Sequence, residues 1–262
     1  MIRLFTSHYP EKCATRLGDL QACLKCNIGN SALDFVCLLL EGVEMPCPSE
    51  DRLQVRAISS RPTYQDFFNW ANSQITTTDN VSIIANSDIY FDDSILALAN
   101  SLKPHQCAAL SRWDLQADQS LRLFDRNDSQ DAWVFRGKIR PMNADFCVGI
   151  PRCDNRILYE LRAAGYEVIN PAFSVRACHL HIGERGEYPA EINGPHVDPP
   201  YAYLWPHNLE SLPVSLLHNL RNPKANLGWR IDWRKLQRTL PWRLFNKIKR
   251  RGARGQERGA KS

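Results

Sequence analysis

The segment at residues 81–93 constrains the fold more than any other part of the chain. It begins with an apolar run rich in β-branched residues, Val81–Ala85, and continues into Asn86, a serine and three aspartates. Such a run is typical of a buried parallel strand, which is apolar on both faces and becomes polar only where it leaves the sheet. Because open α/β sheets bind ligands at the carboxyl ends of their strands, Asp88 and Asp92 are expected at a ligand-binding edge.

The carboxylates after this strand admit two interpretations. Carboxylate oxygens on a short turn are suitable ligands for a divalent cation such as Mg²⁺ or Mn²⁺, which in turn neutralises a diphosphate. Aspartates in a turn also accept hydrogen bonds from nearby amides or cap a helix, and Asp93 is placed to cap a helix that begins near Ser94. Both interpretations remain open for Asp88 and Asp92, and Asp93 is the expected helix cap.

Strand-like and helix-like segments alternate on the amino-terminal side of this stretch. The expected elements are strands at 2–6, 34–40 and 53–58, a helix ending near 26 and a helix at 64–73 that starts after Pro62 and Thr63. Such alternation is typical of βαβ units and a parallel sheet. The expected fold class is α/β, with a Rossmann-like, mostly parallel central sheet flanked by helices and a basic C-terminal extension.

The same analysis predicts further elements beyond residue 93. They are a helix at about 94–102, a strand at 106–111, paired strands at 121–124 and 131–135, a short strand at 146–151, a helix from Asp154 to about 164 and an extended segment at 166–175. Gly165 is expected to end the last of these helices, because glycine readily adopts the left-handed conformation found there.

Composition limits the broad class of the protein. The 262 residues are 44% hydrophobic and 23% charged, which is typical of a globular protein rather than a disordered one. The N-terminus lacks the apolar stretch of a signal peptide, and no run reaches the length of a membrane span. Nine cysteines without a regular spacing favour free thiols. These features predict a cytoplasmic protein.

The C-terminal part of the chain differs in character from the rest. Six prolines between 189 and 213 predict a surface segment that wraps over the body. From Trp229 onward, twelve residues are Lys or Arg and two are acidic. The expected division is a catalytic domain at 1–188, a wrapping segment at 189–228 and a basic amphipathic tail at 229–262.

The basic tail has three interpretations: a solvated terminal segment, an amphipathic helix on an anionic membrane surface, or a contact with nucleic acid. Trp242, Leu244, Phe245 and Ile248 lie among arginines and lysines, which favours a peripheral position at the inner face of a membrane. The body of the chain has no aromatic RNA-binding motif, so nucleic acid is the less favoured partner.

Four segments, followed by histidines at positions 179 and 181, carry a family resemblance. The segments are Asn86–Asp92 (NSDIYFD), Ser111–Asp114 (SRWD), Ser129–Phe135 (SQDAWVF) and Cys153–Arg156 (CDNR). Over residues 2–188 this order of features resembles the nucleotide-sugar glycosyltransferases of the GT-A fold. More narrowly, it looks like bacterial and viral proteins described as glycosyltransferase-like.

The resemblance implies a role for several residues. The turn at Asp88 would help to bind Mn²⁺ or Mg²⁺ and the donor diphosphate, and His179 or His181 would complete the metal site. These two histidines share one face of a strand, so their spacing does not choose between them. Asp154 would act as the catalytic base of an inverting reaction. The expected donor-binding residues are Thr6, Tyr9, Arg16, Asn86, Asp88, Arg112, Trp113 and Asp114.

Physical chemistry adds Asp131 as a second catalytic candidate. A carboxylate beside an indole, here Trp133, is a frequent arrangement in sugar sites, so Trp133 and Asn155 are acceptor-binding candidates. Alternatively, Trp133 faces the core. Asp154 lies at a predicted helix N-terminus, which favours an ionised carboxylate with a low pKa whether or not it catalyses. Arg112 would contact either the diphosphate or a neighbouring aspartate in a surface ion pair.

Three hypotheses follow from these features. The first is a metal-assisted glycosyltransferase that moves a sugar from a nucleotide-sugar donor to a glycan or a lipid-linked acceptor, for example in polysaccharide biosynthesis. The second is a noncatalytic module on the same fold that binds a nucleotide or a glycan. The third is a protein that binds nucleic acid through the tail at 229–262.

Overall fold

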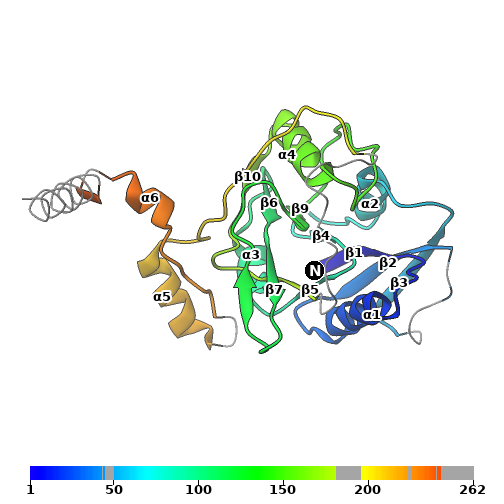
Figure 1. Ribbon diagram of the computed structural model, residues 1–262, viewed down its shortest axis with the longest axis horizontal. Helices are drawn as coiled ribbons and strands as arrows, with labels where there is room; N and C mark the ends of the chain where they lie inside the picture. The colour runs from blue at the N-terminus through cyan, green and yellow to red at the C-terminus, as the bar shows by residue number, and fades with distance from the viewer. Residues whose placement is uncertain (43, 45–49, 181–195, 224–225, 240, 243–262) are drawn as a thin grey trace, which may run out of the picture. The chain divides into compact units, whose positions relative to one another are not determined.

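The computed structural model describes residues 1–42, 44, 50–180, 196–223, 226–239 and 241–242. The chain divides into two compact units, Met1–Gly228 and Trp229–Ser262. The first unit contains two β-sheets, and helices pack on both faces of the larger one (Figure 1). This is the expected α/β class.

The larger sheet has seven strands, and its carboxyl edge positions the candidate site. Their order is β10 (Glu167–Ile169), β6 (Gln106–Leu110), β9 (Ala132–Arg136), β4 (Val81–Ala85), β1 (Ile2–His8), β2 (Phe35–Glu41) and β3 (Leu53–Ile58). β9 runs antiparallel to both of its neighbours, whereas the β10–β6, β4–β1, β1–β2 and β2–β3 pairs are parallel. The mostly parallel sheet expected from the apolar runs is confirmed.

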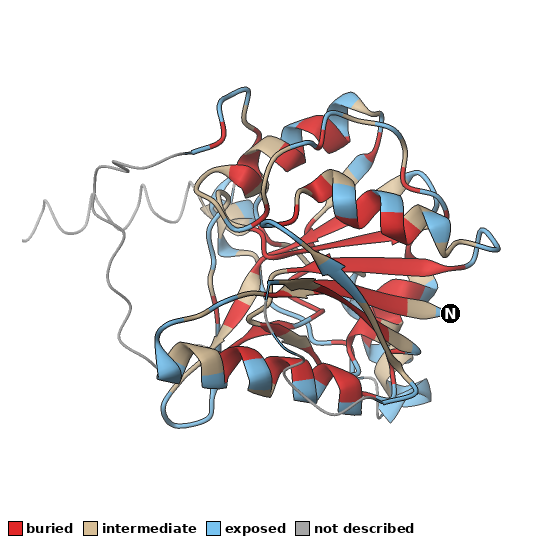
Figure 2. Ribbon diagram, turned by 90° about the vertical axis from the view of Figure 1, so that its right-hand side faces the viewer, coloured by how far each residue is buried: buried red, intermediate tan, exposed pale blue. Residues whose placement is uncertain are grey.

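Two helices cover each face of this sheet. Helices α1 (Ala14–Gly29) and α3 (Ile95–Ser101) pack with Leu4 of β1, whereas α2 (Tyr64–Ser73) and α4 (Cys153–Ala163) pack with Phe5 on the opposite face. Successive strand residues point to opposite faces, so a strand with a core on each side must be apolar throughout. The central strands are accordingly buried between the helical layers (Figure 2).

A smaller sheet continues from the carboxyl ends of β4 and β6. Its strands are, in order, β5 (Ile89–Phe91), β11 (Ala177–His179), β7 (Arg112–Leu115) and β8 (Leu121–Leu123). The chain reaches β5 directly after the turn that follows β4, and it reaches β7 through Ser111 directly after β6. The smaller sheet therefore brings together the residues that follow these two central strands.

The predicted pairing of 121–124 with 131–135 is wrong. β8 pairs with β7, whereas β9 lies between β4 and β6 in the larger sheet. Ala132, Trp133, Val134 and Phe135 are all fully buried, as a strand covered on both faces requires. Proximity in sequence favoured a hairpin, but burial on both faces placed β9 in the centre of the sheet.

Three further predictions also need correction: a strand, a helix cap and the first residue of a helix. The segment 146–151 is not a strand. Its described β-type pairing is one isolated bridge between Thr63 and Cys147. Asp93 is not the cap of α3, because Ser94 takes the N-cap position and its amide donates to Asp92 over 3.0 Å. α4 begins at Cys153 rather than at Asp154, after an arginine in the left-handed conformation.

The described residues from 196 to 228 belong to the first unit and make hydrogen bonds to distant parts of it. The amide of Ala202 donates to the carbonyl of Asn155, and that of Leu204 donates to the carbonyl of Asn127. This part of the chain also contains helix α5 (Leu212–Arg221), which the proline-rich pattern did not predict.

The second unit contains helix α6 (Trp233–Gln237), which is capped by the Asp232 carboxylate. No described helix combines the length and the apolar character needed to cross a lipid bilayer.

Candidate functional site

The site lies where three central strands of the larger sheet meet at one edge. Ala132, the first residue of β9, pairs with Ala85 at the end of β4 and with Leu110 at the end of β6. Because β9 runs against its neighbours, Asp131 precedes its strand at the edge where β4 and β6 end. The register of β9 therefore explains why Asp131 lies at the edge where polar groups were expected.

His179 connects two acidic residues that are distant in sequence. Its Nδ1 lies 2.8 Å from Oδ1 of Asp114, and its Nε2 lies 3.1 Å from Oδ2 of Asp88. The register of the smaller sheet accounts for this arrangement, because His179 pairs with Asp114 on one side and with Ile89, next to Asp88, on the other. Directly paired residues place their side chains on the same face of a sheet.

Arg112 extends this arrangement to Asp131. Its Nε donates to Asp114 over 2.9 Å, and its Nη1 lies 3.3 Å from Oδ2 of Asp131. The guanidinium also stacks over the Phe124 ring, with 4.1 Å between Cζ and the ring centroid. Asn86 donates to Asp131 from its side chain over 3.1 Å. Arg112 therefore forms ion pairs with two aspartates, but its side chain is 11% exposed, so these are not the surface pair expected as one alternative.

Arg16 on α1 approaches the site from the opposite side. Its Nη2 donates to Oδ2 of Asp88 over 2.5 Å, and the two side chains are 21% and 14% exposed. Arg16 also interacts with the Tyr9 hydroxyl. Thr6 at the end of β1 is buried, and its hydroxyl has no hydrogen-bond partner among the described residues. Three of the predicted donor-binding residues thus lie on β1, the loop after it and α1.

Asp154 lies in the first turn of α4, near the start of β9. Its Oδ2 accepts the backbone amide of Gln130 over 3.3 Å, and its Oδ1 accepts the amide of Asn155 over 2.9 Å. Burial and the nearby charge of Asp131 raise the pKa of Asp154 to about 7. The expected low pKa is wrong, because burial and a neighbouring carboxylate outweigh the amides of the first helical turn.

At Asp88, Asp114 and His179, unlike at Asp154, the pKa shifts favour the charged form of each side chain. Burial alone would raise the pKa of Asp88, but His179 and Arg16 hold it well below its usual range. The pKa of Asp114 is lowered to about 2, because His179 and Arg112 outweigh the effect of burial. Burial disfavours the imidazolium of His179, yet the two aspartates raise its pKa above the ordinary value. The pairing therefore favours charged forms of all three groups.

Three predicted ligand-binding residues are buried in the protein. Trp133 is fully buried and packs edge to face on Tyr64 with 4.9 Å between the centroids, so a sugar cannot stack on it. Trp113 is 7% exposed and donates to the carbonyl of Ala172. Asn155 is 1% exposed. The predicted acceptor contacts of Trp133 and Asn155, and the donor contact of Trp113, are therefore corrected to structural roles.

Two oxygen atoms at the turn after β4 are candidate ligands for a divalent cation. Oδ1 of Asp88 and Oδ1 of Asn86 are buried without a hydrogen-bond partner among the described residues. Carboxylate and amide oxygens are ligands for Mg²⁺ and Mn²⁺. His179, in the charged form that its two aspartate partners favour, has no free lone pair for a metal. The described residues contain no cluster of three or more acidic, histidine or cysteine side chains arranged to hold a metal. His181 lies outside the described residues.

Gln130 is a site residue that sequence reasoning missed. It is 1% exposed, its amide holds Asp154, and its Oε1 has no partner among the described residues. Its side-chain nitrogen lies 3.3 Å from the carbonyl of Leu204, which belongs to the proline-rich segment. Its position directly before Asp131 could have indicated a role in the site. The sequence of a polar loop, however, does not predict that a glutamine in it is buried.

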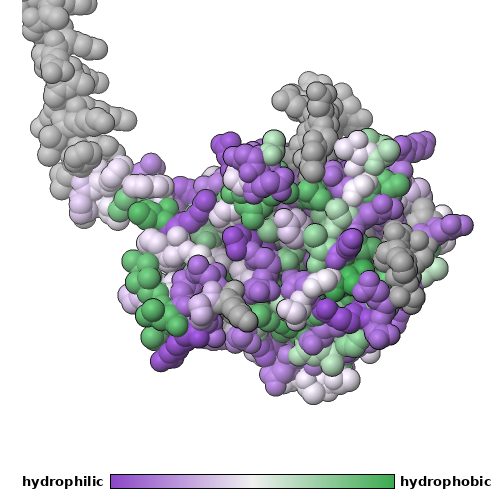
Figure 3. Space-filling view, turned by 90° about the horizontal axis from the view of Figure 1, so that it is seen from below, coloured by the Kyte–Doolittle hydropathy of each residue, from purple (hydrophilic) through white to green (hydrophobic). Residues whose placement is uncertain are grey.

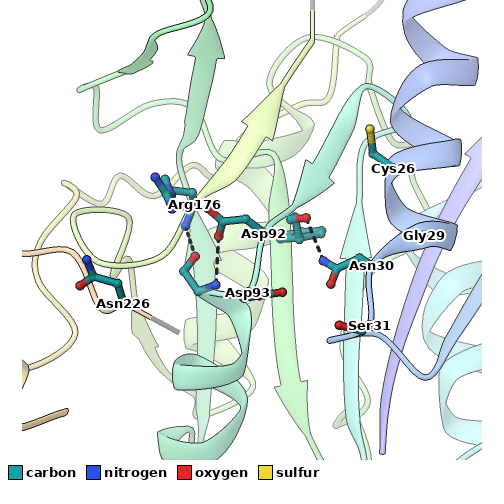
Figure 4. A pocket seen from close by; sticks show the side chains of 10 residues that line it. Cys26, Gly29, Asn30, Ser31, Asp92, Asp93, Arg176 and Asn226 are labelled. Carbon is teal, nitrogen blue, oxygen red and sulfur yellow. Dashed lines mark hydrogen bonds and ion pairs between the residues drawn. The ribbon is translucent and has the colours of Figure 1, made fainter. Parts of the chain in front are cut away.

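Asp92 belongs to a different part of the surface from Asp88. It forms an ion pair with Arg176 over 2.5 Å and lines a cavity of about 440 Å³ together with residues of α1 and the start of α3 (Figure 4). Asn30 also lines this cavity, where its side chain donates to the carbonyl of Phe91. The two acids of the predicted turn therefore do not share one site.

The chain is similar in structure to several solved proteins, although no protein-family model and no curated protein matches it. HddC from Yersinia pseudotuberculosis aligns with a TM-score of 0.36 and 11% identity, over 52% of this chain and 77% of its own. The 2-C-methyl-D-erythritol 4-phosphate cytidylyltransferase of Francisella tularensis aligns with a TM-score of 0.35 and 12% identity, over 52% and 72%.

A third similar structure is the mannosyltransferase PcManGT from Pyrobaculum calidifontis, which was solved in complex with GDP-Man and Mn²⁺. It aligns with a TM-score of 0.45 and 12% identity, over 71% of this chain and 58% of its own. At these identities the likeness concerns the fold and not the activity.

Proposed function

We propose that this protein is a glycosyltransferase that moves a sugar from a nucleotide-sugar donor to a hydroxyl of a glycan or a lipid-linked acceptor. One observation carries the proposal: four carboxylates, two arginines and a histidine gather at the carboxyl edge of the central sheet. They are Asp88, Asp114, Asp131, Asp154, Arg16, Arg112 and His179. Open α/β sheets bind ligands at this edge.

On the donor side, the departing nucleoside diphosphate needs positive charge. Arg16 and Arg112 stay protonated, because the aspartates beside them raise the pKa of each guanidinium. Asp88 and Asn86 would hold Mn²⁺ or Mg²⁺, which when bound supplies charge that stabilises the leaving diphosphate. Tyr9, just after β1, would contact the nucleoside, whereas the buried hydroxyl of Thr6 is not accessible to it.

On the acceptor side, transfer needs a group that removes the proton of the attacking hydroxyl. A general base works best when its pKa lies near the working pH, and the pKa of Asp154 is about 7. The Gln130 amide orients this carboxylate, while Asp131 raises its proton affinity. The hydroxyl proton would therefore move to Asp154 as the oxygen attacks the donor sugar.

A thermal-shift screen of the purified chain against UDP-, GDP-, CMP- and TDP-sugars, with and without Mn²⁺, tests the donor assignment. A ligand that binds only the folded state stabilises it, by about 2.7 kcal/mol at a concentration 100 times its Kd. We expect an Mn²⁺-dependent shift with one class of nucleotide. The variant Asp88→Asn should lose this shift, because an amide is a weaker metal ligand than a carboxylate.

Asp92→Asn is the matched control for this experiment. It makes the same chemical change at the other end of β5, but Asp92 pairs with Arg176 away from the site, so the donor shift should persist. Retention of the Mn²⁺-dependent shift in Asp88→Asn would contradict the donor assignment. Donor binding without sugar transfer to any acceptor would instead support a noncatalytic nucleotide-binding or glycan-binding module.

A further inference from the structure

Helix α5 exposes an unusual amount of hydrophobic side chain. Its exposed hydrophobic residues are Leu212 (41%), Val214 (45%), Leu216 (55%), Leu217 (47%) and Leu220 (81%). They form a hydrophobic patch at the left edge of the view in Figure 3. Large exposed hydrophobic patches on soluble proteins mark interaction surfaces.

The four leucines lie along one side of α5. With 3.6 residues per turn, positions 212, 216, 217 and 220 form a stripe, and Ser215, the one buried residue of the helix, points away from its centre. The helix is held to the first unit near its C-terminal end. The Asn219 side chain donates to the carbonyl of Leu227 and accepts its amide, and Leu227 is 1% exposed. The stripe is therefore presented outward on an anchored helix.

Cationic residues follow this stripe closely in sequence. Arg221 ends α5, and residues 222–228 separate it from the second unit. The segment 229–262 has ten more basic than acidic residues, whereas the rest of the chain has five more acidic than basic residues. Trp229, Ile231 and Trp233 in the second unit are each more than a third exposed. Exposed tryptophans among basic residues are typical of segments at the headgroup level of a bilayer.

We propose that the leucine stripe of α5 docks into the surface of a lipid bilayer that carries anionic headgroups. The four leucines would enter the boundary between headgroups and acyl chains, and the excess of ten basic residues in the sequence of 229–262 favours anionic headgroups. A surface of five partly exposed aliphatic residues is small beside the roughly 800 Å² that each partner buries in a stable protein complex. A second copy of the chain therefore fits this face less well than a bilayer does.

This inference is independent of the proposed transfer reaction and can be tested without a substrate. Full-length protein would be sedimented with vesicles of phosphatidylcholine and phosphatidylserine, and with vesicles of phosphatidylcholine alone. The chain should bind the anionic vesicles preferentially. The double variant Leu216→Glu/Leu220→Glu should bind the anionic vesicles at least about tenfold more weakly, because two charged groups would have to enter the apolar boundary.

The matched control is Tyr159→Glu/Tyr203→Glu. It replaces two other exposed hydrophobic residues, 39% and 46% exposed, and changes the net charge by the same amount. This variant should bind nearly as well as the unaltered chain. Equal binding by the leucine variant and the control would overturn the proposal in favour of the basic segment alone. Failure of the unaltered chain to bind either vesicle would also overturn it, as would a dimer by light scattering that the leucine substitutions dissolve.

Discussion

At the scale of single residues, the four site carboxylates differ in their immediate partners. Asp88, Asp114 and Asp131 each lie beside at least one cationic side chain. The described hydrogen bonds of Asp154 come from backbone amides, and, after burial, the negative charge of Asp131 contributes most to its raised pKa. A buried carboxylate without a cation binds its proton more tightly. The cluster thus contains two acids with lowered pKa values, Asp88 and Asp114, and one acid, Asp154, whose pKa suits proton transfer.

This difference predicts the behaviour of Asp154→Asn. Donor binding should persist, because Asp154 makes no described contact with Asp88 or Arg16, whereas sugar transfer should fall by at least about a hundredfold without the base. The transfer rate of the unaltered enzyme should rise with pH around a midpoint near 7. A rate independent of pH between 5 and 9, or a fully active variant, would contradict the role of Asp154 as base.

The structure of α2 shows how a single element fixes part of the core. Thr63 caps the helix by accepting the Asp66 amide over 3.2 Å, and the Asp66 carboxylate accepts the Thr63 amide over 2.8 Å. The helix that begins there buries Tyr64 against Trp133 of β9. Because Trp133 directly follows Ala132 at the site edge, α2 supports the strand that positions Asp131.

Removal of this cap should destabilise the protein measurably. Thr63→Ala should lower the free energy of unfolding by about 1 kcal/mol in urea denaturation, whereas Thr63→Ser should retain most of the stability. Ser211→Ala is a matched control, because Ser211 occupies the N-cap of α5 without a side-chain cap bond. An equal loss in the Thr63 and Ser211 variants would show that the hydrogen bonds at Thr63 do not stabilise α2.

At the scale of the whole molecule, the shifted pKa values make stability depend on pH in two directions. Asp88 and Asp114 have lowered pKa values, so their contribution is present above the unfolded-state pKa and is lost as pH falls through the folded value, about 2 for Asp114. Asp154 and His179 have raised pKa values. Their contribution to the free energy of unfolding is therefore present at low pH and is lost as pH rises through the folded-state pKa values, about 7 for Asp154.

The chain should therefore be most stable in mildly acidic solution, between about pH 4 and pH 6. Urea unfolding of the chain from pH 3 to pH 9 would test this, with Asp154→Asn as the comparison. The variant should match the unaltered chain near pH 4, become more stable as pH rises to about 7 and keep an advantage on the order of 4 kcal/mol above that, since the pKa of Asp154 is raised from its ordinary value of 3.8 to about 7. A constant difference across the whole range would show that Asp154 does not titrate near pH 7.

The amino-acid sequence alone determined the elements whose evidence is local. Apolar runs such as Val81–Ala85 identified the strands of a mostly parallel sheet, and Pro62 with Thr63 identified the start of α2. Acids after a buried strand correctly indicated the carboxyl edge, because polar groups are tolerated only where such a strand leaves the core. These features depend on burial and on backbone hydrogen bonding within a few residues.

Tertiary structure alone decided the contacts that join distant segments. Register brought His179 between Asp88 and Asp114, and the reversed direction of β9 brought Asp131 to the edge where β4 and β6 end. Trp133, a candidate for stacking on a sugar, is fully buried in the core. Burial also raised the pKa of Asp154. Strand pairing and burial depend on the whole sheet, so no local pattern of residues specifies which side chains meet or which charges are removed from water.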